Sequence, residues 1–399
     1  MPESTTHPLD DRVVAMVREA ASRVTVFADR LRAAGLSPDD IRGVGDLDAL
    51  PILTKDEVLA MQREQPPYGG LLAADATVRR AFQSPGPIYE PQLDGADPWR
   101  WREALAAAGF ASADMLLNCF GYHLSPAGAM FEEAALAAGC TVVPGGVGNL
   151  DLQAQAIADL GVTAYTGLPS YLKALIERYD ESGLDPARWR LDKAIVTAEP
   201  LPDSLRALLT ERVPVVRMAY GTAETGLLGY ETEPAGGLVV PNDVLVQVCD
   251  LDTGRSLAAG EGQIVVTLLR PDYPLVRFGT GDLSAWQPGP VPGDRPRLAG
   301  VLGRVGAAVK VRGMFLHPRQ IEAVMRDLRG VTSYRFVVDR VEHRDELRCE
   351  VVPAAEATAE RVAAAVRDRI RSGLRFAARV EVVADLSEGP LLVDVRTWD

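Results

Sequence analysis

The sequence of 399 residues has few cysteines, few lysines and no long apolar run, and each shortage excludes a class of protein. The four cysteines lie far apart and form no CxxC pair, so we expect neither a disulfide framework nor a zinc knuckle. No apolar run approaches the ~18 residues that a membrane helix needs. The polar, acidic first residues are unlike a signal peptide. With a formal net charge of −13 and no basic stripe, the sequence predicts a cytoplasmic protein without nucleic-acid or membrane partners.

Lysine is scarce among the 42 basic residues, so a mechanism that requires an ammonium group has few candidates. The lysines are Lys55, Lys173, Lys193 and Lys310. The hydrophobic share of 47% and the charged share of 24% are ordinary for a globular protein, and the length suggests two domains.

Hydrophobic periodicity predicts one large and one small domain. The first 35 residues are expected to form an amphipathic helix, and a second, short helix is expected within 50–61. From residue 114 to 226 buried strands alternate with helices, which predicts a mostly parallel sheet covered on both faces. Short alternating strands then indicate a small antiparallel sheet or barrel. The predicted fold class is α/β, with a large N-terminal domain of residues 1–304 and a small α+β domain of residues 305–399.

Polar residues in glycine-containing loops follow several predicted strands, where open parallel sheets bind their ligands. These loops are TGLPSY at 166–171, TAEP at 197–200, YGTAETG at 220–226 and RFGTGD at 277–282. Glu224 in the third loop could hold a metal or a polar ligand, or it could simply stabilise the turn. Asp282 in the fourth could accept hydrogen bonds from two neighbouring hydroxyl groups.

Together and in this order, the segments resemble the phenylacetate–CoA ligase branch of the adenylate-forming superfamily, which includes acyl-CoA ligases and nonribosomal adenylation domains. The resemblance runs from LDALPILTKDEV at 47–58 to the region of Asp394, and YGTAETG is similar to the family's YGxSExxG. Further motifs that carry it are FGYH at 120–123, EGQIVVT at 261–267, RFGTGDL at 277–283 and GRVGAAVKVRGMFLHPRQIE at 303–322.

The resemblance implies a fold, a reaction and a set of site residues. Family members use ATP and Mg²⁺ to form an acyl-adenylate, and after the small mobile domain rotates, a thiol, usually that of CoA, takes the acyl group. Glu224 would be the Mg²⁺-associated carboxylate, and Lys310 would face the site after rotation. The implied nucleotide-site residues are Tyr220, Gly221, Thr222, Arg277, Asp282 and Arg304. The implied acyl-pocket residues are Phe120, Tyr122, His123, Ala198 and Tyr220.

The phosphate loop departs from the family pattern. The family reads approximately SSGTTGxP, whereas this chain has SPGPIYEP at 84–91. The degenerate loop consists of Ser84, Gly86, Pro87, Ile88 and Tyr89. Because proline has no N–H and isoleucine has no hydroxyl group, we expect poor binding of a triphosphate. Glu90 is expected to add an unfavourable negative charge.

The C-terminal tail also departs from the pattern, since Pro390 stands where the family has a lysine that bridges the carboxylate and the α-phosphate. Loss of such a charge typically costs several kcal/mol of transition-state stabilisation. The hinge also differs, with Gly306 where the family usually has aspartate. His123 could act as a general base, or it could be an ordinary pocket histidine. The segment 283–302 contains neither Cys nor His, so we expect no metal site there.

Three functions remain open. The first is a divergent enzyme of a biosynthetic pathway that acts on a small, aromatic carboxylic acid or acyl intermediate, with ATP-dependent adenylation lost or impaired and no cofactor needed. The second is an active carboxylate–CoA or carboxylate–AMP ligase that uses ATP, Mg²⁺ and CoA. The third is a non-catalytic binding protein of the same fold. Because relatives are often dimers, a homodimer is an expectation that the resemblance supplies.

Overall fold

The computed structural model describes residues 7–84, 86–234, 236–288, 295–305, 309–312, 314–316, 318–374 and 376–397. The chain divides into two compact units. The first comprises Met1–Thr197 and Ala207–Gly303, and the second comprises Ala198–Arg206 and Arg304–Asp399. Of the helices in the described ranges, none combines the length and the apolar character that crossing a membrane requires.

The N-terminal segment forms two helices, α1 (Asp10–Arg23) and α2 (Thr25–Ala33), so the prediction of one continuous helix was wrong. The chain breaks at Val24, whose backbone is extended (φ −123°, ψ 98°). Because of this break, Phe27 on α2 reaches the same hydrophobic core as Val13 on α1. The short 3-10 helices η1 (Pro38–Asp40) and η2 (Val44–Ala49) follow.

The helix α3 (Lys55–Glu64) begins at a capping box. The Thr54 hydroxyl accepts a hydrogen bond from the backbone of Glu57, and the Glu57 carboxylate accepts one from the backbone of Thr54. This reciprocal cap fixes the first turn of α3, where Lys55 stands. The antiparallel hairpin of β1 (Val78–Gln83) and β2 (Tyr89–Leu93) comes next, followed by α4 (Trp101–Ala107).

An eight-stranded sheet occupies the centre of the first unit, in the order β13-β9-β8-β7-β6-β5-β3-β4. Its parallel part consists of β3 (Met115–Asn118), β4 (Thr141–Val143), β5 (Ala164–Gly167), β6 (Lys193–Val196) and β7 (Val215–Thr222). The antiparallel part consists of β8 (Gly226–Tyr230), β9 (Leu238–Val239) and β13 (Arg297–Leu298).

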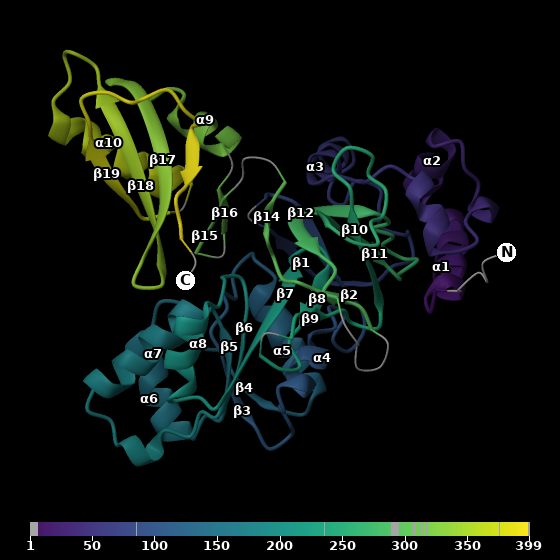
Figure 1. The fold of residues 1–399 in the computed structure, drawn as a ribbon, viewed down its shortest axis with the longest axis horizontal. Helices are drawn as coiled ribbons and strands as arrows, with labels where there is room; N and C mark the ends of the chain where they lie inside the picture. Colours follow the sequence, from purple (N-terminus) through teal and green to yellow (C-terminus); the bar gives the residue numbers. More distant parts are fainter. Residues whose placement is uncertain are drawn as a thin grey trace. The chain divides into compact units, whose positions relative to one another are not determined.

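Helices cover both faces of this sheet, as the alternation of strands and helices predicts (Figure 1). On one face α4 and α5 (Ala127–Ala137) pack through Trp101 and Phe131 against Leu116, Ala164 and Ile195. The helices α6 (Leu150–Leu160) and α7 (Pro169–Glu181) lie on the other face. The remaining helical segments of this region are η3 (Pro186–Arg188) and α8 (Asp203–Thr210).

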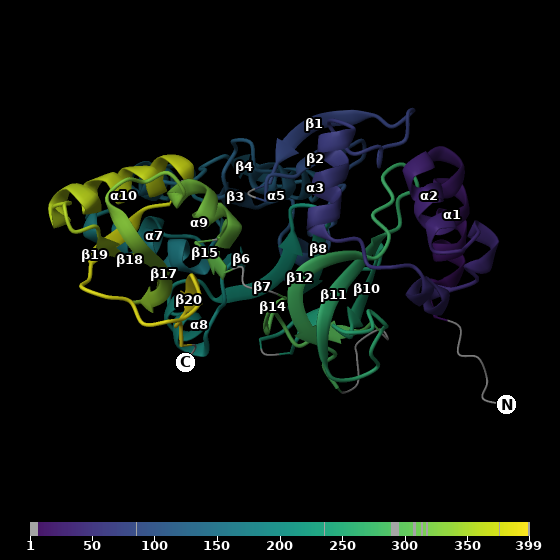
Figure 2. The same cartoon turned by 90° about the horizontal axis from the view of Figure 1, so that it is seen from above.

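A second, curved sheet has the order β10-β11-β12-β14 (Figure 2). It is built from β10 (Val244–Cys249), β11 (Glu261–Leu268), β12 (Phe278–Ala285) and the short edge strand β14 (Gly303–Arg304). The pairs β10–β11 and β11–β12 are antiparallel, as the short alternating strands predict. The segment before α3 joins this sheet, because Leu53 exchanges backbone hydrogen bonds with Arg277 and Gly279.

The second unit is an α+β fold around the long antiparallel hairpin of β17 (Val331–Val341) and β18 (Arg344–Pro353). The parallel edge strands β19 (Ala378–Val382) and β20 (Leu392–Asp394) complete a sheet of order β19-β18-β17-β20. The helices α9 (Pro318–Met325) and α10 (Ala359–Gly373) share one hydrophobic core with it, and β15 (Val309–Val311) pairs with β16 (Met314–Leu316). The predicted α/β fold class, with a small α+β C-terminal part, is confirmed.

The turn between β7 and β8 depends on Gly226, which has φ +73°. A Cβ atom on Gly226 would lie 2.6 Å from the carbonyl oxygen of Trp99. Gly161, which ends α6, has a similar φ of +68° but open space around the missing Cβ.

We predict that Gly226→Ala lowers the free energy of unfolding by about 3 kcal/mol or more, because the strain of a positive φ and the clash with the Trp99 backbone both contribute. Gly161→Ala is the matched control and should cost only about 1 kcal/mol, because this position has the strain of a positive φ but no clash. Urea denaturation of the two variants measures the difference. Equal costs would show that the contact with Trp99 relaxes freely.

Candidate active site

The two sheets of the first unit meet at a hydrogen bond between Tyr220 on β7 and Asp282 on β12. The Tyr220 hydroxyl donates to the Asp282 carboxylate over 2.8 Å, and both side chains are buried. The Asp282 backbone N–H donates to the Thr280 hydroxyl, which in turn donates to the carbonyl of Ile264. Two of the residues implied for nucleotide binding therefore lie together, in an orientation that the strands fix.

Two sets of hydrogen bonds hold the loop of residues 222–225 between β7 and β8. Thr222 and Thr225 share a hydroxyl–hydroxyl hydrogen bond of 2.9 Å. The buried Arg100 guanidinium donates to the carbonyls of Thr225 and Leu227. Burial lowers the pKa of Arg100 to about 10, so the guanidinium stays charged near neutral pH. A Cβ on Gly221 would lie 2.4 Å from a backbone oxygen, so this glycine serves the packing of the hairpin itself.

Glu224 lies in this loop and pairs with Lys55 of α3. The distance from Lys55 Nζ to Glu224 Oε1 is 2.7 Å, and only 5% of the Glu224 side chain is exposed. Desolvation by itself would raise the pKa of Glu224, but the charge and hydrogen bond of Lys55 outweigh it and hold the pKa below its ordinary value. The sequence analysis counted Lys55 among four lysines without assigning it to the site. Its place in the motif TKDEV was the only sequence feature that could have assigned Lys55 to the site.

Two further buried polar groups, Glu90 of β2 and Tyr273, lie next to this pair. Together with Glu224 they line a cavity of about 30 Å³, which has room for one or two water molecules. Among the described residues, Glu90 Oε1, Glu224 Oε2 and the Tyr273 hydroxyl have no hydrogen-bond partner. Burial first, and the charge of Glu224 second, raise the pKa of Glu90 well above its ordinary value. Burial thus opposes the negative charge that Glu90 is expected to add, because it favours the protonated form of the carboxyl group.

The segment expected to bind phosphate is the tight turn between β1 and β2. The Ser84 amide donates to the Ile88 carbonyl over 2.9 Å, and the Tyr89 amide donates to the Gln62 side chain over 2.8 Å. Ile88 is only 1% exposed and belongs to the hydrophobic core beneath the turn, whereas Pro87 is exposed and Gly86 half-buried. Two backbone amides of this turn are therefore already used inside the protein.

The residues implied for the acyl pocket differ in their surroundings. Phe120 is buried and stacks on Phe131, with 4.6 Å between ring centroids. Tyr122 is 38% exposed, and its hydroxyl accepts a hydrogen bond from Asn118 over 2.8 Å. Burial, followed by Glu132, raises the pKa of Tyr122. The side chain of His123 is exposed.

The loop of residues 119–126, which carries Tyr122 and His123, lies beside the β1–β2 turn, because the Gln83 amide donates to the Leu124 carbonyl over 2.8 Å. Ala198 belongs to the second compact unit and has φ +71°, a strained value for alanine. The assignment of an acyl pocket to these residues stays a prediction.

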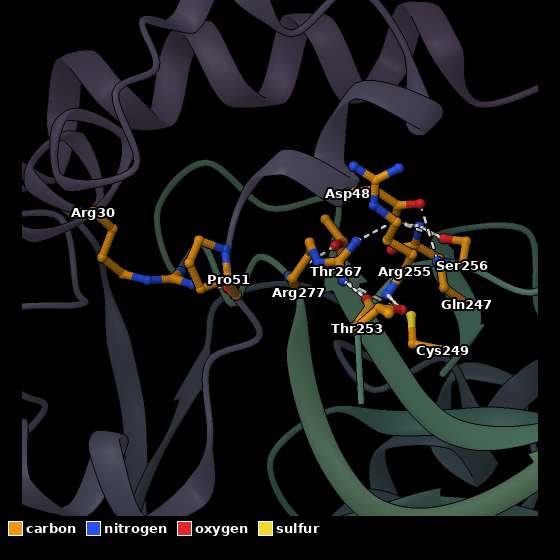
Figure 3. Close-up of polar contacts among 11 residues, drawn as sticks. Arg30, Asp48, Pro51, Gln247, Cys249, Thr253, Arg255, Ser256, Thr267 and Arg277 are labelled. Carbon is orange, nitrogen blue, oxygen red and sulfur yellow. Dashed lines mark hydrogen bonds and ion pairs between the residues drawn. The ribbon is translucent and has the colours of Figure 1, made fainter. Parts of the chain in front are cut away.

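Arg277 has a structural environment that the sequence analysis did not anticipate (Figure 3). Its side chain is 1% exposed, and the guanidinium donates to the Asp48 carboxylate and to the Gly254 carbonyl. Asp48 also accepts hydrogen bonds from the backbone and the hydroxyl of Ser256. Arg277 thus connects η2 to the second sheet, and this geometry favours a structural role over the implied contact with a nucleotide.

The remaining candidates belong to the second unit. Arg304 lies in β14 and is half-buried, and Lys310 lies in β15, opposite Phe315 of β16. Pro390, at the lost lysine position, is exposed just before β20. The expected hinge residue Gly306 and the side chain of Lys310 lie outside the described residues. In the part of the chain that is described, no three His, Cys, Asp or Glu side chains are grouped so as to hold a metal ion.

Comparison with known proteins agrees with the resemblance seen in the motifs. Residues 109–267 match the family of AMP-binding enzymes, and residues 313–388 match the AMP-binding enzyme C-terminal domain. The chain is 29% identical to the phenylacetate-coenzyme A ligase of Thermus thermophilus, over 86% of this chain and 80% of that protein. It is 28% identical to that of Aromatoleum evansii, over 88% of this chain and 82% of the relative. The structure of 2-hydroxyisobutyryl-CoA ligase, in complex with 2-HIB-AMP and CoA, superposes with a TM-score of 0.84 at 22% identity, covering 99% and 91% of the two chains.

We predict that Arg277→Ala lowers the free energy of unfolding by about 3–5 kcal/mol, because it leaves Asp48 without its buried partner. The control Arg188→Ala removes an ion pair with Asp159 in which both side chains are about half exposed, and should cost about 0–1 kcal/mol. Urea denaturation measures both. A variant of normal stability that has lost affinity for AMP would restore the nucleotide-contact hypothesis for Arg277.

Proposed function

Because the chain belongs to the adenylate-forming enzymes and is similar to phenylacetate–CoA ligases, we propose that it is a divergent enzyme of this family that acts on a small, aromatic carboxylic acid or acyl intermediate. We further propose that it forms an adenylate from ATP poorly or not at all. The observation that carries this second part is the turn of residues 84–89, where the family's phosphate loop would lie.

A phosphate cradle needs several backbone N–H groups that point at the ligand. In this turn Pro85 and Pro87 have no N–H, and the amides of Ser84 and Tyr89 donate within the protein. Only Gly86 and Ile88 remain as backbone donors among six residues. The side chain of Ile88, which stands at a threonine position of the family, is packed into the core and carries no hydroxyl group.

The loss of the C-terminal lysine supports the same proposal. Pro390 provides neither a positive charge nor a donor, so this position cannot stabilise the charge that develops at an α-phosphate. The two losses lie in different parts of the chain and affect the same chemical step, the formation of the acyl-adenylate.

The adenosine side supports retained binding of a nucleotide or an acyl-nucleotide. Tyr220 orients the Asp282 carboxylate, and a carboxylate can accept several hydrogen bonds at once, as the two hydroxyl groups of a ribose would require. This pair favours the second candidate function, an ATP-dependent carboxylate–CoA ligase in which ATP, Mg²⁺ and CoA are used. Neither candidate function requires a macromolecular partner.

Binding and exchange experiments on the purified full chain distinguish the two functions. We predict that AMP binds in the micromolar to millimolar range, and that Mg·ATP binds no more tightly than AMP, because the phosphates gain few contacts. No pyrophosphate exchange should occur with a panel of aromatic acids. Calorimetry and an ATP–pyrophosphate exchange assay provide the measurements. Tight Mg·ATP binding together with acid-dependent exchange would establish the active ligase instead.

The adenosine side is tested by Asp282→Asn. This variant should bind AMP about 10- to 100-fold more weakly, because hydrogen bonds to a charged acceptor contribute about 1.5–3 kcal/mol. Asp252→Asn, which changes an exposed aspartate on a turn, is the matched control and should bind AMP as the wild type does. Unchanged AMP affinity in Asp282→Asn would remove Asp282 from the nucleotide site.

A further inference from the structure

The family resemblance implies Mg²⁺ beside Glu224, so the surroundings of this carboxylate decide whether a divalent cation fits. Lys55 Nζ lies 2.7 Å from Glu224 Oε1, the distance of a charge-assisted hydrogen bond. The positive charge that the carboxylate requires is therefore already provided by the chain. A divalent cation bound at the same oxygen would be repelled by the ammonium group.

Lys55 and Glu224 are each held in place by the segment of the chain that carries them. The capping box of Thr54 and Glu57 fixes the start of α3, and the Lys55 ammonium also lies 6.0 Å from the centre of the Phe278 ring. Glu224 is held by the hairpin turn that Arg100 clamps through backbone carbonyls. If Lys55 left the pair, the buried Glu224 carboxylate would lose its charged partner.

The second oxygen of Glu224 faces the small cavity, and the charges around that cavity do not favour a divalent cation either. The residues that line it include two carboxyl groups, Glu90 and Glu224, but also two guanidinium groups, Arg100 and Arg270. Arg270 is also paired with Asp272 at 3.0 Å, so Lys55, on the other oxygen of Glu224, and Arg100 are the two positive groups left to balance the two carboxyl groups. The oxygen atoms without partners, Glu90 Oε1 and the Tyr273 hydroxyl, are suited to one or two water molecules in a space of about 30 Å³.

We infer that the Lys55 ammonium is the resident cation of this site, and that it replaces the divalent metal which the family resemblance implies at Glu224. The site therefore binds its ligands without Mg²⁺. This inference rests on the proposed function in one respect, the assignment of Glu224 to the ligand-binding face.

The test uses Mn²⁺ alone as a probe, titrated into the full-length protein and followed by the paramagnetic resonance signal of free Mn²⁺. The wild type should bind no Mn²⁺ at Glu224 up to roughly 1 mM. Lys55→Met keeps the length of the side chain but removes the charge, and should bind one Mn²⁺ at least about tenfold more tightly than the wild type does. The double variant Lys55→Met/Glu224→Gln should lose this gain.

Lys173→Met is the matched control, because Lys173 also forms an ion pair with a glutamate, Glu177, at 2.6 Å on a helix. It should gain no Mn²⁺ binding. Two results would overturn the inference: wild-type Mn²⁺ binding that Glu224→Gln abolishes, or a folded Lys55→Met variant that binds Mn²⁺ no better than the wild type. Thermal unfolding shows whether the variants are folded, and should Lys55→Met fail to fold, the comparison of wild type with Glu224→Gln decides alone.

No nucleotide or acid takes part in these titrations, so their outcome is separate from that of the pyrophosphate-exchange assay. A wild type that binds Mn²⁺ at Glu224 but shows no exchange would overturn the role of Lys55 and leave the loss of adenylation standing. Pyrophosphate exchange without Mn²⁺ binding at Glu224 would leave the role of Lys55 standing and overturn the proposed loss of adenylation.

Discussion

A carboxylate buried at the tip of a hairpin turn has to be neutralised, and the first compact unit meets this constraint with the ion pair of Lys55 and Glu224. Leaving one member of such a pair without its partner typically costs about 3–5 kcal/mol, so the elements that carry both residues must be placed accurately. The Lys55 segment is fixed by the capping box and by the backbone bonds of Leu53 to β12. The Glu224 turn belongs to the eight-stranded sheet. The pair therefore joins both sheets of the unit through one short segment before α3.

The two ends of the proposed site, the Tyr220–Asp282 hydrogen bond and the 84–89 turn, differ in their capacity to bind a ligand. At one end, Tyr220 and Asp282 come from different sheets, and their hydrogen bond is compatible with a further ligand because carboxylate oxygens accept more than one donor. At the other end, two amides of the 84–89 turn donate within the protein, that of Ser84 to the Ile88 carbonyl and that of Tyr89 to the Gln62 side chain. Glu224 also lines a cavity of about water size. The side proposed for adenosine thus keeps an acceptor for a ligand, whereas the turn proposed for phosphate uses two of its amides within the protein.

Local patterns predicted most of the fold, because helices and strands of the region 114–226 each bury their own periodic face. The break at Val24 was missed, since its cause is tertiary: Phe27 turns back onto the core of α1. Side-chain partners far apart in sequence were missed for a similar reason. Arg277 pairs with Asp48, and Lys55 with Glu224, across separations that periodicity does not describe. The family motifs singled out Tyr220, Asp282 and Glu224; the first two are hydrogen-bonded to each other, and the third pairs with Lys55, which the motifs did not assign to the site.

Retained residues and retained function are separate questions at this site. The Tyr220–Asp282 hydrogen bond stabilises the junction of two sheets whether or not a nucleotide is present, so selection for folding alone would preserve it. The same holds for Gly221 and Gly226, whose missing Cβ atoms make room for the backbone of the hairpin. The turn of residues 84–89 is different, because its two prolines have no N–H group and its isoleucine, Ile88, is buried in the core beneath the turn. Differences in the 84–89 turn therefore carry more information about the reaction than similarities around Asp282, and they support the proposed impairment of adenylation.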